Sequence, residues 1–315
     1  MRILSAVVLC AALYGAPGDH WIVEKGGTIK QDAEARIVEV NLSGTWISDA
    51  DLPALREIET IQKLDLSHTR VTDLGFQQLK ALPNVTYLNL YYAEQIGDEA
   101  LATVKGWKNL RWLNVRGTKI TDAGLAQLAG LQLEHIDVGF SLFTDNGFDH
   151  FTAIPGLSSI ACGGNKVTDV GMNALRSLSD LKALDLSGAQ RTDSGLWAAI
   201  ITNQGLESIA QLGKLESLNL KASKITDAGS AQLAALKNLK ELNIAETQLS
   251  AKGLAFLADL QNLEKLSLWK SAKVDDEAVL ILAKLKNLRW LDVKETKITP
   301  QGVDRLRREG LEILY

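Results

Sequence analysis

The sequence predicts an α/β fold, a right-handed solenoid or horseshoe with a parallel β-sheet on its concave face and helices on its convex face. Three observations predict it. A strand-like opening recurs every 23 to 25 residues, with one interval of 34. Each unit continues with a second half whose apolar residues recur at helical spacing. A strand and a helix in so short a unit cannot bury a core alone, so neighbouring units must stack.

Composition supports a packed chain and excludes several classes of function. The 315 residues are 46% hydrophobic with only 5 prolines, which argues for a sizeable core and against disorder. A net charge of -4 and a pI of about 5.7 give no field that attracts a polyanion, so we expect no nucleic-acid binding. The two cysteines, Cys10 and Cys162, cannot build a zinc cluster or a disulfide framework within one chain.

Residues 1–18 have the pattern of a signal peptide. Arg2 gives a basic start, Ile3 to Leu13 is an almost unbroken apolar run, and small residues follow it. The run is short for a membrane span, so we expect cleavage before Asp19 and no stable membrane insertion. A retained anchor and lipidation at Cys10 are the alternatives. The expected location is the periplasm, the cell envelope or the extracellular space.

The rest of the chain divides into a cap, a repeat array and a closing strand. Residues 19–36 contain Gly26 and Gly27, and we expect them to shield the open edge of the first repeat. Residues 37–310 hold eleven repeats, and 311–315 form a terminal edge strand. The repeats and the closing strand open at Ile37, Ile61, Val85, Leu110, Leu133, Leu157, Leu181, Leu215, Leu239, Leu263, Leu288 and Leu311.

Each repeat combines an alternating strand with a capped helix. Leu110 to Val115 is apolar at positions one, four and six, and Ile120 to Ala129 carries a Thr-Asp helix start. The same start recurs at Thr72-Asp73, Thr168-Asp169, Thr192-Asp193 and Thr226-Asp227. A glycine follows early in the helix, where we expect close approach between repeats: Gly75, Gly124, Gly147, Gly171, Gly195, Gly229, Gly253 and Gly302.

From Ile37 to Tyr315 this pattern resembles the leucine-rich repeat superfamily, in its ribonuclease-inhibitor-like form. The signature Leu-x-x-Leu-x-Leu is met at Leu181 to Leu186 and its counterparts. The second half resembles the cysteine-containing subclass and, more closely, secreted Thr-Asp-x-Gly-Leu repeat proteins of planctomycete-type bacteria. Position nine departs from the usual Asn or Cys, with a Thr hydroxyl expected to bond loop backbone at Thr45, Thr69, Thr118, Thr247 and Thr296, and Asn165 as the exception.

The resemblance also implies an alternative role. Such repeats serve as substrate-recognition arms in F-box ubiquitin ligases. No F-box-like segment precedes Ile37 and a signal peptide contradicts that role.

The repeat that opens at Leu181 is ten residues longer than most. Within it, Thr202 to Leu206 repeats the pattern of Thr192 to Leu196. We therefore expect an insertion near 195–213, an extra turn or helix that carries Trp197 and bulges on the convex side.

The sequence gives no support for catalysis. No His-Glu-x-x-His, Gly-x-Ser-x-Gly, phosphate-loop or dinucleotide pattern occurs, and Cys162 takes an inward position. We predict no enzyme activity, no cofactor and no metal site. The Asn and Asp residues at position five predict a hydrogen-bonded ladder across the strands, with a calcium site as the weaker alternative.

The concave face carries the candidate binding residues, because positions three, five and seven project from the inner surface. Aromatic residues with Arg have the composition of an interface hot spot. A first group contains Tyr87, Tyr91, Tyr92, Trp112, Arg116, His135 and Phe140, with His68 at its border. A second group contains Trp269 and Trp290, which the register sets beside Lys294 and Lys265 for cation–π contacts.

Between the two groups, small residues form a valley where a ligand backbone can come close: Ser159, Gly163, Gly164, Ala183, Ser187 and Gly188. The alternative is that the aromatic residues only cover the sheet and strengthen cross-strand pairing. The sequence thus predicts a secreted, non-catalytic module that binds a protein or peptide on its concave face. Glycan binding and a purely architectural role in the envelope are the other hypotheses.

Overall fold

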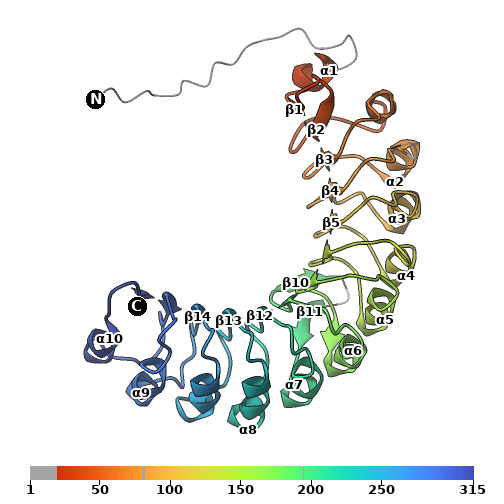
Figure 1. The fold of residues 1–315 in the computed structure, drawn as a ribbon. Helices are drawn as coiled ribbons and strands as arrows, with labels where there is room; N and C mark the ends of the chain where they lie inside the picture. Colours follow the sequence, from red (N-terminus) through yellow and green to blue (C-terminus); the bar gives the residue numbers. More distant parts are fainter. Residues whose placement is uncertain (1–19, 80–81, 194) are drawn as a thin grey trace, which may run out of the picture.

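The computed structural model describes residues 20–315 except 80, 81 and 194. The expected signal peptide, with Cys10, lies outside the described residues. Figure 1 shows stacked repeats in an arc, with the strands inside and the helices outside. The predicted α/β solenoid is therefore confirmed.

One 13-stranded sheet lines the concave side, in the order of the chain. Its first two strands are antiparallel and all later neighbours are parallel. The strands are β1 (Thr28–Gln31), β2 (Ile37–Asn41), β3 (Lys63–Asp65), β4 (Tyr87–Asn89), β5 (Trp112–Asn114), β6 (His135–Asp137), β7 (Ser159–Ala161), β9 (Ala183–Asp185), β12 (Ser217–Asn219), β13 (Glu241–Asn243), β14 (Lys265–Ser267), β15 (Trp290–Asp292) and β16 (Glu312–Leu314).

The convex side consists of short helices, several of them 3₁₀. The α-helices are α1 (His20–Glu24), α2 (Asp73–Phe76), α3 (Asp98–Val104), α4 (Asp122–Ala126), α5 (Phe148–Phe151), α6 (Asp169–Leu175), α7 (Asn203–Ile209), α8 (Asp227–Ser230), α9 (Val279–Leu282) and α10 (Pro300–Leu306). The 3₁₀ helices are η1 (Leu52–Glu57), η2 (Gln77–Leu79), η3 (Asp145–Gly147), η4 (Ala231–Ala235), η5 (Lys252–Asp259) and η6 (Asp276–Ala278).

A continuous apolar core runs between the sheet and the helices. The side chains at positions one, four and six face it, as Leu110, Leu113 and Val115 do. Each fully buried aliphatic side chain contributes about 1.5–3 kcal/mol of transfer free energy. Cys162 lies in this core, as predicted, and burial raises the pKa of its thiol well above the usual value. The thiol therefore stays protonated and unreactive.

The threonines at position nine bond the loop backbone directly after the strand, as predicted. The Thr118 hydroxyl donates to the carbonyl of Val115 at 2.5 Å, and the other four threonines make the same bond. Asn165 donates to the carbonyl of Cys162 at 2.9 Å and to that of Val138 in the previous repeat at 2.8 Å. The side chain at position nine thus hydrogen-bonds the backbone at the end of the strand in its repeat.

Carboxylates of one repeat bind the helix start of the next, a ladder that the sequence pattern does not predict. Asp98 accepts from the backbone N–H of Thr121 at 2.8 Å and from its hydroxyl at 2.6 Å. The Thr121 oxygen accepts from the N–H of Ala123, the cap that the sequence predicts. The same two bonds recur from Asp49 to Thr72, Asp122 to Thr144, Asp145 to Thr168, Asp169 to Thr202, Asp227 to Ser250 and Asp276 to Thr299.

The early helical glycines fit against this ladder. A Cβ on Gly124 would lie 2.2 Å from Oδ1 of Asp98, which confirms the predicted close approach between repeats. Gly195 is the exception, because it lies in an inserted hairpin. Gly205 takes its place, and a Cβ there would lie 2.4 Å from Oδ1 of Asp169.

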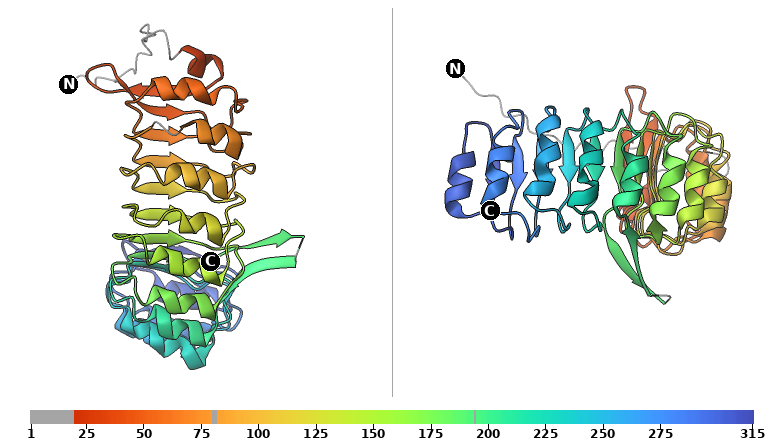
Figure 2. Two further views of the ribbon diagram at one scale, coloured as in Figure 1. Left: turned by 90° about the vertical axis from the view of Figure 1, so that its right-hand side faces the viewer. Right: turned by 90° about the horizontal axis from the view of Figure 1, so that it is seen from below.

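The insertion is a β-hairpin, so the predicted extra helix on the convex side is wrong. β10 (Ala189–Thr192) and β11 (Gly195–Ile200) are antiparallel, and β11 also pairs in parallel with β8 (Val167–Thr168). Figure 2 shows the hairpin projecting sideways from the edge of the solenoid. Gln190 anchors it by donating to the carbonyl of Ser141 at 2.7 Å. The segment from 203 to 209 is the ordinary helix of that repeat, α7.

The two ends of the array are closed by different elements. β1 pairs with β2 in antiparallel fashion, and Ile22 of α1 is fully buried. At the other end β16 continues the parallel sheet, with Ile313 opposite Leu291. The first strands and the last strands thus form two arms of one arc (Figure 1), called here the N-terminal arm (β2–β6) and the C-terminal arm (β12–β16).

Candidate functional site

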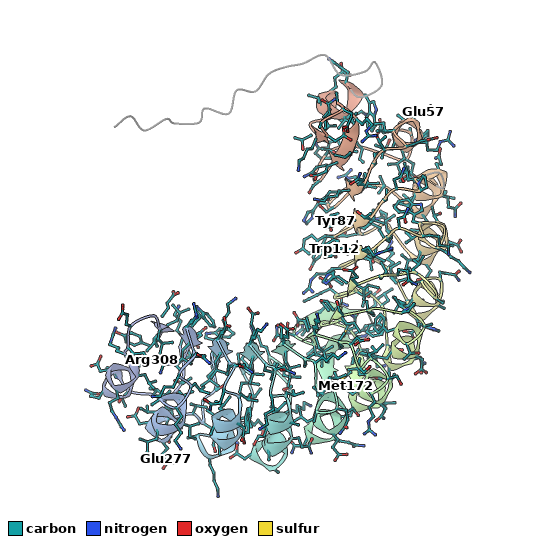
Figure 3. The ribbon with its side chains drawn as sticks, viewed as in Figure 1. Glu57, Tyr87, Trp112, Met172, Glu277 and Arg308 are labelled. Atoms are coloured by element: carbon teal, nitrogen blue, oxygen red, sulfur yellow. The ribbon has the colours of Figure 1, made fainter. Side chains whose placement is uncertain are left out.

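Three rings from adjacent strands of the N-terminal arm form a stacked column. Tyr87 and Trp112 stack with centroids 4.1 Å apart and planes 8° apart. Trp112 and His135 stack at 5.0 Å and 9°. The parallel register places the three residues directly opposite one another. Figure 3 shows Tyr87 and Trp112 pointing into the concave space.

A second cluster of rings lies beside the column. The ring of His68 is 5.1 Å from that of Tyr91, edge to face, and 5.8 Å from that of Tyr92, stacked. Tyr91 and Tyr92 meet edge to face at 4.7 Å. Together, Tyr87, Tyr91, Tyr92, Trp112 and His135 with His68 at the border form one surface, the aromatic patch.

Arg116 and Phe140 pack against each other. The guanidinium of Arg116 lies 4.4 Å from the ring centre of Phe140 and 3.4 Å from Oδ1 of Asp137. The Phe140 ring lies across the next two repeats, since a Cβ on Gly164 or Gly188 would meet it within 3 Å. These two predicted site residues therefore pack against the protein itself, and Arg116 is already paired.

The chain itself covers the glycines in the valley of small residues. The Phe140 ring covers Gly164 and Gly188, and a Cβ on Gly163 would lie 1.5 Å from the carbonyl oxygen of Ser187. Ser159 and Ala183 remain half-exposed on the sheet, so the approach of a ligand backbone to the valley stays a prediction. The small residues allow adjacent repeats to touch where the two arms meet.

Trp269 lies in a network of charges in the C-terminal arm. Lys221 and Lys270 have their Nζ atoms 4.3 and 4.1 Å from the ring centre, and Nε1 of Trp269 donates to Glu295 at 3.2 Å. Lys221 also pairs with Glu246 at 3.1 Å. The sequence analysis predicted a cation–π partner for Trp269, but the predicted residue, Lys294, was wrong. Acidic neighbours determine where each lysine side chain points.

Lys265 lies opposite Trp290, as the register predicts. Its Nζ, however, is 2.6 Å from Oε1 of Glu241, so the predicted cation–π contact is replaced by an ion pair. Within the described residues, no ring or cation stacks on Trp290. Trp290 lines an open hollow of about 430 Å³ over β12–β15, together with Trp269, Asn219 and Asn243.

The position-five residues mostly end the strands. Asn114 Oδ1 accepts from the backbone N–H two residues later at 2.9 Å. Asn89 donates across to Asp65 at 2.9 Å, so the predicted ladder between position-five side chains holds at this step. Asn219 donates instead to Ser187, at position seven of the previous repeat, at 3.1 Å. The bond to the residue two positions on recurs at Asn41, Asp65, Asn89, Asp137, Asp185, Asn219, Asn243 and Asp292.

Burial perturbs three titratable groups around the column. It lowers the pKa of His135, whose Nδ1 is 2.8 Å from Oγ of Ser159. It raises the pKa of Asp137, although Arg116 opposes this change. Burial and the nearby Asp65 carboxylate raise the pKa of Tyr87. At neutral pH, His135 and Tyr87 are therefore uncharged.

The described part of the chain offers no cluster of three or more His, Cys, Asp or Glu side chains that could hold a metal ion. In the same residues, no helix is long and apolar enough to cross a membrane.

A family model for the leucine-rich repeat region matches residues 41–309. The chain belongs to the leucine-rich repeat family. No curated protein matches this leucine-rich repeat chain.

Solved structures share its fold at low sequence identity. An internalin from Listeria monocytogenes is 18% identical with a TM-score of 0.61, and the match covers 94% of this chain and 92% of the internalin. The ectodomain of the Arabidopsis receptor kinase HAESA, in complex with an IDA peptide hormone, is 16% identical with a TM-score of 0.61 over 91% and 47% of the two chains. A TDR receptor is 18% identical with a TM-score of 0.56 over 85% and 45%. The leucine-rich repeat chain thus spans about half the length of these receptors.

Proposed function

We propose that this chain is a non-catalytic recognition module that binds a protein or peptide on the concave face of its N-terminal arm. The observation that carries the proposal is the aromatic patch. Rings held by stacking on a rigid sheet lose little conformational freedom when a partner binds, so they are efficient anchors. Trp112 lies at the centre, between Tyr87 and His135.

The structural neighbours support the same class of function. The HAESA structure is a receptor ectodomain in complex with a peptide hormone. The sequence identity between HAESA and this chain is low. The structural similarity therefore supports peptide binding on a repeat scaffold but does not indicate a particular ligand.

The test is capture of a partner from the native envelope and culture fluid. Wild type is compared with a Tyr91→Ala/Trp112→Ala double variant, after circular dichroism has shown equal folding. A protein retained by wild type and lost from the double variant supports the proposal. Equal retention by both, or retention of nothing, contradicts it. A Lys63→Ala variant is the matched control, because Lys63 lies on the adjacent strand and pairs with Glu39.

Glycan binding at the hollow of the C-terminal arm is the second candidate. Trp290 leaves a ring face for a sugar, and the neighbouring Asn219 and Asn243 provide amide groups. The stacked column is a poor sugar site, because its rings cover one another. Retention on a polysaccharide column that is lost in Trp290→Ala and kept in Trp112→Ala supports this candidate. Retention that depends on Trp112, or no retention, contradicts it.

We also propose that the chain is exported and belongs to the secreted Thr-Asp-x-Gly-Leu group of these repeats. The apolar run from Ile3 to Leu13 and the recurring helix starts support this. Expression with the natural N-terminus, followed by N-terminal sequencing of the exported chain, tests it. A mature chain that begins at Asp19 is the expected result, and retention of Met1 contradicts it.

A further inference from the structure

One flank of the solenoid carries a row of side chains, one from each repeat. Each lies two positions before the Thr of its helix start, or before the residue that takes the place of this Thr. All of these side chains are exposed. This flank row consists of Trp46, Arg70, Gln95, Lys119, Leu142, Lys166, Ile200, Lys224, Gln248, Lys273 and Lys297.

Contacts between repeats show that the flank row is continuous. The Nζ of Lys119 donates to Oε1 of Gln95 at 3.3 Å, and the guanidinium of Arg70 lies 5.0 Å from the ring centre of Trp46. The backbone N–H of Lys119 also donates to the carbonyl of Ile96 in the previous repeat. The same backbone bond to the previous repeat recurs at Leu142, Lys224, Gln248 and Lys297.

The flank row has charge of one sign. No acidic residue occupies any of its positions, and six of its members are cations: Arg70, Lys119, Lys166, Lys224, Lys273 and Lys297. In the part of the chain that the structure describes, none of these six forms an ion pair. The row is therefore a local positive surface on a chain whose net charge is -4.

Acidic neighbours offset the row only toward its two ends. Glu246 pairs with Lys221, Glu295 accepts from Trp269, and Asp275 caps η6. The acidic residues within two positions of the row along the chain are Glu94, Glu246, Asp275 and Glu295, and the hairpin adds Asp193. The stretch of the row from Lys119 to Lys224 thus has no acidic residue within two positions.

The opposite flank differs, because its charges alternate in sign. There Lys240 pairs with Glu216 of the previous repeat at 2.6 Å. The charged residues at position two of the repeats are Arg111, Lys182, Lys240 and Arg289, and Glu134, Glu216, Glu264 and Glu312. These charges cancel, so the excess of cations belongs to the flank row alone.

Exposed apolar side chains lie among the cations. Trp46 is 78% exposed, and Leu142 and Ile200 are also exposed. The hairpin of β10 and β11 leaves the flank directly before Ile200, and Figure 2 shows it projecting from that side. On the hairpin, Leu196 is 68% exposed and lies opposite Arg191. The flank therefore combines unpaired cations with apolar groups that face water.

We propose that the flank row is a peripheral docking surface for an anionic lipid bilayer. Near such a surface each Lys or Arg gains about fivefold in affinity. Trp, Leu and Ile side chains enter the boundary between headgroups and acyl chains. A soluble polyanion would pair with the cations but would leave Leu142, Leu196 and Ile200 in water. The combination of side chains therefore favours the bilayer.

The shape of the molecule agrees with a flat partner. The right-hand view of Figure 2 shows the array running level from end to end, with the hairpin projecting from one flank. The hairpin thus meets the headgroup layer first, and the row follows along its length. The concave face stays open in this orientation. The inference concerns a different surface from the aromatic patch and does not depend on the proposed function.

The test measures co-sedimentation of the full chain with sucrose-loaded vesicles. One set contains phosphatidylcholine alone, and the other contains about one third phosphatidylglycerol. We expect at least about tenfold tighter binding to the anionic vesicles, and added salt should weaken it. The apolar run from Ile3 to Leu13 is present in both measurements, so the difference between the lipids reports charge. Equal binding to both sets, or no binding to the anionic set, overturns the inference.

A triple variant tests the central cations. Lys119→Gln/Lys166→Gln/Lys224→Gln should weaken binding to the anionic vesicles about a hundredfold, because it removes three cations from the surface. Circular dichroism should show an unchanged fold, since all three side chains are exposed.

The matched control removes the same charge elsewhere. Lys105→Gln/Lys182→Gln/Lys284→Gln replaces exposed lysines outside the flank row and should bind within about threefold of wild type. Equal losses in the two triple variants would show that only net charge matters, and would overturn the inference.

A hairpin variant separates a bilayer from a soluble polyanion. Leu196→Ser should weaken vesicle binding about three- to tenfold, because the leucine no longer enters the bilayer. Leu280→Ser is the control, since Leu280 is 64% exposed on α9, outside the row, and it should leave the affinity unchanged. Heparin is the soluble probe. If heparin binds through Lys119, Lys166 and Lys224 while Leu196→Ser keeps wild-type affinity for vesicles, the row recognises charge alone and the inference fails.

Discussion

In the N-terminal arm the rings stack on one another, whereas in the C-terminal arm Trp269 lies among lysine and glutamate side chains. The column of Tyr87, Trp112 and His135 uses ring faces for internal packing and leaves ring edges to a partner. Trp269 has two lysines on its ring and a glutamate on its N–H. One strand framework thus produces a preorganised aromatic surface at one end and an internally compensated charge network at the other.

The largest expected difference between the arms is in partner binding. With the captured protein as ligand, Trp112→Ala should reduce affinity by about thirtyfold or more, the effect of losing a central aromatic anchor of roughly 2 kcal/mol. Trp269→Ala should change it less than about threefold, because its contacts are satisfied within the protein. Isothermal titration calorimetry gives both values. A larger loss for Trp269→Ala would move the binding surface to the C-terminal arm.

The repeat period, the buried positions and the position-nine bonds could be predicted from the sequence because each depends on residues within one repeat. The hairpin could not. Thr192 to Leu196 and Thr202 to Leu206 have the same local pattern, but Asp169 of the preceding repeat binds Thr202, and that pair of bonds leads into α7. A contact between repeats, invisible in either pattern alone, decides which copy becomes the helix.

In the candidate site, too, the local sequence pattern determines some features and not others. The strand register predicted that Tyr87, Trp112 and His135 are neighbours, and the structure confirms it. The register did not predict where long charged side chains point. Lys265 turns to Glu241 instead of Trp290, since a flexible ammonium group follows the nearest carboxylate.

The ladder between repeats gives a second, smaller contrast between the arms. Asp98 lies in the N-terminal arm and is partly buried, so Asp98→Ala leaves the N–H of Thr121 without a partner and should cost about 2–3 kcal/mol. Asp276 makes the same bonds at an exposed step, where water can replace the carboxylate. Asp276→Ala should therefore cost less.

Urea unfolding followed by circular dichroism measures both losses. Asp180→Ala is the control, because Asp180 forms an exposed ion pair with Lys214 outside the ladder, and its unfolding midpoint should match wild type. If Asp98→Ala and Asp276→Ala lower the free energy of unfolding equally, burial does not distinguish the two Asp–Thr contacts.

The smallest expected effect is a pH dependence of folding stability, which His135 produces in the N-terminal arm alone. Burial lowers the pKa of His135 below its usual 6.5, so the folded chain resists protonation that the unfolded chain accepts. The stability that depends on neutral His135 is therefore present above pH 6.5 and is lost as pH falls through the lowered pKa. Trp112 stacks on this ring and Oγ of Ser159 lies 2.8 Å from its Nδ1. Asp137, which pairs with Arg116, lies two residues further along the same strand.

His135→Phe keeps a ring in the column and removes the titration. Between about pH 7.5 and about pH 5.5, the urea midpoint of wild type should fall more than that of the variant. Asp137 acts in the opposite sense, because its raised pKa adds stability below its usual value of 3.8 and loses it as pH rises. Asp137 is present in both proteins, so the comparison of wild type with His135→Phe isolates the effect of His135. The contrary result is a difference in urea midpoint between wild type and His135→Phe that is the same at both pH values. That result would mean that His135 stabilises the column through packing alone and that its burial does not oppose protonation.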